Sequence, residues 1–144
     1  MVEARIGPSK LPLAVFTLAL LMAVRSVSEM TYWSALAHQR LGEEREAAGI
    51  FNSIYEYSIQ LEAARPAIDY FATSLPAMLL LNEDLAQRNR MQARFLRAQA
   101  LVGLGRTSEA EALLLEVLEM DINHSGAADL LDQVRMQWDK ASAG

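Results

Sequence analysis

Three arginines form the most specific polar pattern in the sequence. Arg90, Arg94 and Arg97 are spaced at i, i+4 and i+7, so a helix would carry their guanidinium groups along one face. Guanidinium groups bind carboxylates and phosphates through parallel hydrogen bonds, so this face could receive an acidic group of a partner. Charges on helices more often pair locally, and the interpretation we favour is pairing with the next predicted helix, through residues such as Glu116 and Glu119.

The remaining ionisable residues show no pattern typical of catalysis. Glutamates gather at positions 43–46 and 109–111, where they complement the dipoles of predicted helix starts. The two histidines, His38 and His124, match no metal-binding motif, and the chain has no cysteine. The sequence also has no glycine-rich phosphate loop and no nucleophile elbow. We therefore expect a protein without catalytic residues, metal ligands or cofactors.

The composition predicts a single all-α domain. The chain has 144 residues, of which 52% are hydrophobic and 22% are charged, so it can bury one core. Glycine and proline number only seven and four, and residues that favour helices dominate. The formal charge of −5 argues against nucleic acid or an anionic membrane surface as a partner, because both require a positive field.

A short segment occurs twice in the chain. "LGEEREAAGIFNSI" contains Gly42, and "LGRTSEAEALLLEV" contains Gly105, which lies 63 residues later (105 − 42). We interpret each glycine as a left-handed residue that ends one helix before the next begins. Two antiparallel helix pairs follow from this interpretation. The hinge and packing residues expected in them are Ala35, Gly42, Ala47 and Phe51 in the first pair, and Ala98, Gly105, Ala110 and Leu114 in the second.

These hinges resemble the tetratricopeptide repeat, a helix pair of about 34 residues with glycine at its turn and Ala-x-x-x-Phe in its second helix. The resemblance covers about residues 29–60 and 91–124. It departs from the family pattern at Ile122, where a closing proline is usual, and at Arg94 and Arg97, where large apolar residues are usual. The resemblance implies an antiparallel helix-pair solenoid, stacked as a right-handed superhelix.

The predicted solenoid domain spans residues 29–140. Between the two repeats, residues 61–90 leave room for a degenerate helix pair, in which Pro66 and Pro76 each start a helix. Apolar residues at helical spacing after Ser125 predict a capping helix over residues 125–139. About three pairs is near the lower limit for a stable array, so we expect self-association or docking to a larger protein.

The first 28 residues contain an uncharged apolar segment, Leu11 to Val24. Its 14 residues are fewer than the roughly 20 that a membrane-spanning helix needs. We favour a buried helix at the end of the stack and a cytoplasmic protein. The alternative is a signal peptide or membrane anchor, because basic residues precede the segment and small residues follow it. Membrane contact is expected only through this segment.

In tetratricopeptide proteins the first helix of each pair lines the inner surface, and this implies a binding groove for a partner peptide or helix. The inner-surface residues on these helices, together with the arginine face, give our candidate binding residues: Tyr32, Gln39, Arg40, Arg90, Gln92, Arg94, Phe95, Arg97 and Gln99. Tyr32 and Phe95 are equally good candidates for the core, since aromatic residues at helical spacing are usually buried. The predicted function is a non-catalytic scaffold for protein–protein interaction.

Two other functions follow from further features. The segments "MTYWSALAHQRLG" and "IDYFATSLPAMLLLNEDLAQRN" resemble the C-terminal repeat region of large bacterial proteins that carry carbohydrate-active-type domains upstream. That resemblance implies an accessory module, or fragment, of a carbohydrate-processing protein. The apolar N-terminal segment instead suggests an exported or membrane-tethered assembly factor.

Overall fold

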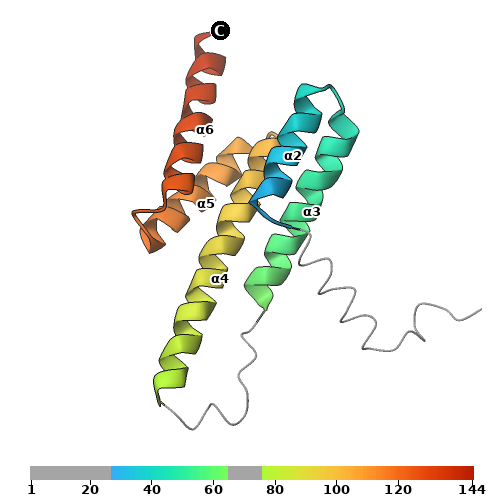
Figure 1. Cartoon of the computed structure of the whole chain (residues 1–144). Coiled ribbons are helices and arrows are strands. Elements are labelled where there is room, and N and C mark those ends of the chain that lie inside the picture. Colours follow the sequence, from blue (N-terminus) through green and yellow to red (C-terminus); the bar gives the residue numbers. More distant parts are fainter. Residues whose placement is uncertain (1–26, 65–75) are drawn as a thin grey trace, which may run out of the picture.

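The structure, a computed structural model, describes residues 27–64 and 76–144. Within these residues it contains five helices and no strand. The helices are α2 (Glu29–Arg40), α3 (Glu44–Ala63), α4 (Pro76–Gly103), α5 (Thr107–Met120) and α6 (Ser125–Ala143). Figure 1 shows α2 beside α3 and α4 beside α5, each joined by a tight turn. The prediction of an all-helical fold built from packed helix pairs is confirmed.

Some predicted segments lie outside the described residues. They are the apolar run Leu11–Val24 and the helix expected to start at Pro66. Among the helices that the structure does describe, none is both long and apolar enough to cross a membrane. Export and membrane attachment therefore remain predictions.

The two hinge glycines have the same backbone geometry. Gly42 and Gly105 both have a φ of +80°, a left-handed conformation that side chains with a Cβ rarely adopt. At the first hinge, Gly42 N–H donates to the Gln39 carbonyl at 3.1 Å and Glu43 N–H donates to the His38 carbonyl at 2.9 Å. The second hinge repeats both bonds 63 residues later, at 3.1 and 2.8 Å. This pair of bonds is the Schellman motif, so both helix pairs turn in the same way.

The alanines and large apolar residues that follow the hinges form the core. Ala35, Ala47 and Phe51 are fully or almost fully buried in one cluster, which also receives Leu96 and Ala100 from α4. A second cluster of ten buried residues joins α4, α5 and α6, and it includes Phe95, Ala98, Ala110, Leu114, Leu131 and Val134. Because α4 contributes to both clusters, it joins the first helix pair to the second.

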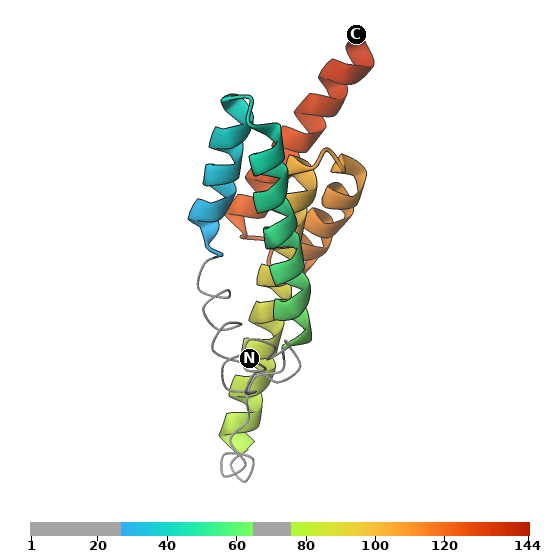
Figure 2. The ribbon, with the colours of Figure 1, turned by 90° about the vertical axis from the view of Figure 1, so that its right-hand side faces the viewer.

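α4 differs from the expected domain organisation. Residue 90 was expected to separate the degenerate pair from the second repeat, but α4 continues through it as one helix of 28 residues. Nothing in the sequence stops this helix, since no glycine or proline occurs between positions 77 and 102. The long helix contacts each of α2, α3, α5 and α6. Figure 2 shows α3 lying along it, and the C-terminal end of α6 extending past its neighbours.

Candidate partner-binding groove

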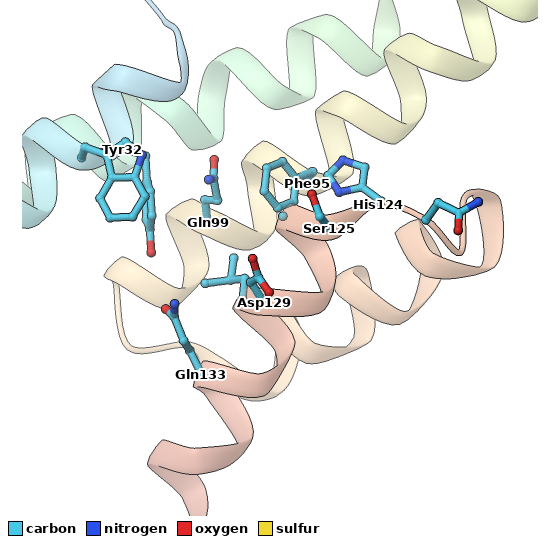
Figure 3. Close-up of a pocket in the computed structure, with 11 residues that line it drawn as sticks. Tyr32, Phe95, Gln99, His124, Ser125, Asp129 and Gln133 are labelled. Atoms are coloured by element: carbon cyan, nitrogen blue, oxygen red, sulfur yellow. The ribbon is translucent and has the colours of Figure 1, made fainter.

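A groove of about 450 Å³ lies between α2, α4 and the start of α6. Its volume is within the range of about 300–1,000 Å³ that is common for ligand pockets. Figure 3 shows Tyr32 on one side of the groove and Phe95, His124 and Ser125 on the other. The lining comes from the first helix of each pair and from the helix that follows the second pair. These elements bring together residues up to 101 positions apart in the sequence, from Tyr32 to Gln133 (133 − 32).

The α2 side of the groove is aromatic. Tyr32 is buried and packs at a centroid distance of 6.2 Å from the Phe51 ring, so it belongs to the core as well as to the groove wall. Burial raises the pKa of its hydroxyl above the ordinary value. Trp33 lies edge-on to Tyr32 at 5.6 Å and remains 57% exposed. Trp33 therefore offers an accessible aromatic surface on a rigid support.

The α4 side contributes a buried amide that lacks a partner. Gln99 is only 6% exposed, and its Oε1 has no hydrogen-bond partner among the described residues. An unpaired buried polar atom costs about 1–3 kcal/mol, so such atoms are usually satisfied. Exchanging the oxygen and nitrogen positions of the amide would leave an unpaired donor instead. Gln99 therefore brings an unsatisfied polar atom to the wall of the groove.

The α6 side is built around a histidine cap. The Nδ1 atom of His124 accepts a hydrogen bond from Ala127 N–H at 3.0 Å, which satisfies one free donor of the first turn. The His124 ring also packs on Phe95 at 4.7 Å. A Cβ on Gly126 would lie 3.0 Å from Cζ of Phe95, so glycine allows α6 to approach α4 closely here. These contacts fix the start of α6 against α4.

Only one of the described residues that line the groove carries a formal charge when histidine is neutral. It is Asp129, which is exposed on α6 one turn after Ser125. The other polar groups of the lining are amides, hydroxyls, the indole of Trp33 and the imidazole of His124. In the described ranges, no three histidine, aspartate or glutamate side chains gather as a metal site would require. The groove is thus a polar and aromatic binding surface with a single negative charge.

No protein-family model matches the chain. No solved structure matches it either.

The structure separates the predicted binding residues into two groups. Tyr32, Phe95 and Gln99 line the groove together. Gln39 instead donates a hydrogen bond from Nε2 to the Gly103 carbonyl at 2.9 Å, which ties the end of α2 to the end of α4. The other predicted residues are outside the groove lining: Arg40, Arg90, Gln92, Arg94 and Arg97.

Two of the three arginines on α4 pair within the molecule. Arg94 lies between Glu62 of α3 and Glu116 of α5, at 3.4 and 3.0 Å. Arg97 bonds to Glu62 at 2.6 Å and donates from Nε to the Ser58 hydroxyl at 3.2 Å. The favoured interpretation, pairing with the next helix, therefore holds for Arg94 through Glu116, whereas Arg97 pairs with Glu62 of the preceding helix, which was not among the partners we expected. Arg90 is exposed.

This ion-pair cluster affects the acidity of Glu62. Burial alone would raise the pKa of its carboxyl group, but hydrogen bonds and charge from Arg97, and then from Arg94, outweigh burial. The pKa of Glu62 is consequently lowered from its ordinary value. The charged form is stabilised in the folded protein, and the cluster joins α3, α4 and α5.

Sequence reasoning missed Trp33 and the groove residues on α6. We assigned the inner surface to the first helices of two pairs and treated residues 125–139 only as a cap. Because α6 follows a completed pair directly, the same rule would have pointed to its first turns, including Asp129. Trp33 carried no such signal, since neighbours in a helix are rotated by about 100° and Tyr32 already occupies the groove face.

Proposed function

We propose that this protein is a non-catalytic, tetratricopeptide-like interaction module that binds an extended segment of a partner protein in the groove of α2, α4 and α6. In this proposal the helix pairs form a solenoid with the right-handed superhelical twist of that family. The repeated Schellman hinges support it, because two equal hairpins stacked through α4 place α2, α4 and α6 around the groove.

The observation that carries the proposal is that one groove contains both the unpaired Oε1 atom of Gln99 and the exposed indole of Trp33. A peptide bond offers both an N–H donor and a carbonyl acceptor, so it satisfies Gln99 in either orientation of the side-chain amide. Trp33 provides the large accessible aromatic surface that often dominates the energy of protein interfaces. A partner segment can therefore gain hydrogen bonds and apolar contact in the same place.

The proposal is tested by selecting peptides from a display library of random dodecapeptides against the full chain. Dissociation constants of the selected peptides are then measured by fluorescence anisotropy. Trp33→Ala is expected to weaken binding at least tenfold, because it removes the main apolar contact of the groove. Circular dichroism should remain unchanged, since most of the indole is already exposed.

Trp138→Ala provides the matched control. Trp138 is 60% exposed, close to the value for Trp33, but it lies near the C-terminal end of α6 and outside the groove lining. Peptides should bind this variant as tightly as the unchanged chain. The proposal is wrong if the two substitutions weaken binding equally, or if Trp33→Ala has no effect.

A further inference from the structure

We propose that the groove selects a partner segment carrying a lysine or arginine side chain, which pairs with Asp129. This inference rests on the proposed function and adds the chemical class of the partner. It depends on three properties of the groove: its charge, its aromatic wall and its unsatisfied acceptor.

The charge of the groove favours a cation. None of the described residues that line it is a lysine or arginine. Some other carboxylates of the described residues form internal ion pairs, with Arg97 bonded to Glu62, Arg106 to Glu109 and Arg135 to Glu111. No basic side chain in the described part of the protein pairs with Asp129. An incoming basic group would therefore find a free carboxylate without displacing an internal ion pair.

The aromatic wall provides a second contact for a basic side chain. Tyr32 and Trp33 line the same groove as Asp129. The face of a tryptophan ring attracts ammonium and guanidinium groups, and the aliphatic part of lysine or arginine packs on such a surface. An acidic side chain would gain less from this wall, because the negative face of the ring repels an anion.

The third property is the unpaired side-chain oxygen of Gln99, which can accept a hydrogen bond from a bound segment. In the orientation that the structure gives, Gln99 Oε1 is buried without a partner in the described residues, so it favours a bound segment that offers a hydrogen-bond donor. A backbone N–H, an ammonium group or a guanidinium group can supply that donor, but a carboxylate cannot.

An acidic partner would bind the same groove less favourably than a basic one. The first turn of α6 could attract an anion through its free backbone N–H groups. His124 already satisfies the Ala127 N–H, and the negative charge of Asp129 lies one turn further along the helix. An anion bound there would face a like charge with no basic lining residue to offset it. The overall charge of −5 further favours approach of a basic segment.

The test uses peptides selected from the random dodecapeptide library by the full chain and retained only if Trp33→Ala weakens their binding. These groove-dependent peptides are expected to share a lysine or arginine. Replacing that residue with norleucine should weaken binding about three- to tenfold, as expected for one partly exposed ion pair.

Asp129→Asn identifies the carboxylate that makes the contact. This variant should bind the basic peptide three- to tenfold more weakly, and the norleucine peptide should bind both chains equally. Asp132→Asn is the matched control, because Asp132 is exposed on the same helix but outside the groove lining. It should bind both peptides as the unchanged chain does.

The outcomes separate the two proposals. The inference about charge is overturned if the groove-dependent peptides lack a basic residue. It is also overturned if norleucine replacement weakens the binding of a peptide to Asp129→Asn as much as to the unchanged chain. In both cases the proposed function still stands. If no selected peptide depends on Trp33, both proposals fail.

Discussion

Glycines in this chain act in different ways at different positions. Gly103 is the last residue of α4 and lies close to Phe51 of the first helix pair. A Cβ at this position would lie 2.3 Å from the ring of Phe51. Phe51 is fully buried, so its ring has no open space to enter. Gly49 lies within α3, and a Cβ there would meet no atom within 4 Å. The two positions form a matched pair for a test of packing.

Gly103→Ala should lower the free energy of unfolding by about 1–3 kcal/mol, because the added methyl group overpacks the contact with Phe51. Gly49→Ala should raise it by about 0.5–1 kcal/mol, because alanine favours the helical backbone and has space. Urea denaturation measures both changes. The packing of the two helix pairs described here is incorrect if Gly103→Ala is as stable as Gly49→Ala.

For individual residues, the residue type alone did not determine which side chains face the groove. Tyr32 and Phe95 could be core residues or groove residues by their type and spacing. In the structure each of them is buried in the core and also lines the groove. Gln39 looks like a groove residue by its spacing, but its amide donates a hydrogen bond to the Gly103 carbonyl at the end of α4. That bond joins residues 64 positions apart, and helical periodicity contains no information about such contacts.

Among the elements, the hairpins agree with the prediction and the long helix does not. A repeated glycine followed by polar residues indicates a helix end and a new start, because only glycine readily adopts the required positive φ. The continuous α4 escaped prediction because we divided its sequence by the expected repeat length. The local signal was the absence of any glycine or proline between positions 77 and 102.

The ion-pair cluster between α3, α4 and α5 predicts a specific dependence of stability on pH. Glu62 has a lowered pKa in the folded protein. Its negative charge therefore stabilises the fold at pH values above 4.5, the ordinary pKa of a glutamate. This contribution is lost as the pH falls below that value and through the lowered pKa. Glu62→Gln should reduce the free energy of unfolding by about 1 kcal/mol at pH 7.

The measurement is urea denaturation of both chains between pH 7 and pH 3. Other carboxyl groups affect both chains alike, so the difference between them isolates Glu62. This difference should shrink as the pH falls below 4.5. A difference that stays constant over the whole range would show that the charge of Glu62 does not stabilise the cluster.

In the whole molecule, the groove forms because the helices pack on one another, and no single segment contains it. Trp33, Gln99 and Asp129 come from three helices that meet only after both hairpins have formed and packed on α4. The sequence predicts the hairpins from local signals. It predicts the groove only through the rule that first helices face inward, and that rule must be extended to α6 to include Asp129.

The most direct test of this account locates a bound peptide on the folded chain. A peptide from the dodecapeptide selection is titrated into uniformly ¹⁵N-labelled protein, and amide shifts are followed by NMR. The account predicts the largest changes at the indole N–H of Trp33, at the side-chain amide of Gln99 and in the backbone of residues 123–126. Changes centred instead on the outer faces of α3 and α5, around exposed residues such as Ile59 and Leu115, would contradict it.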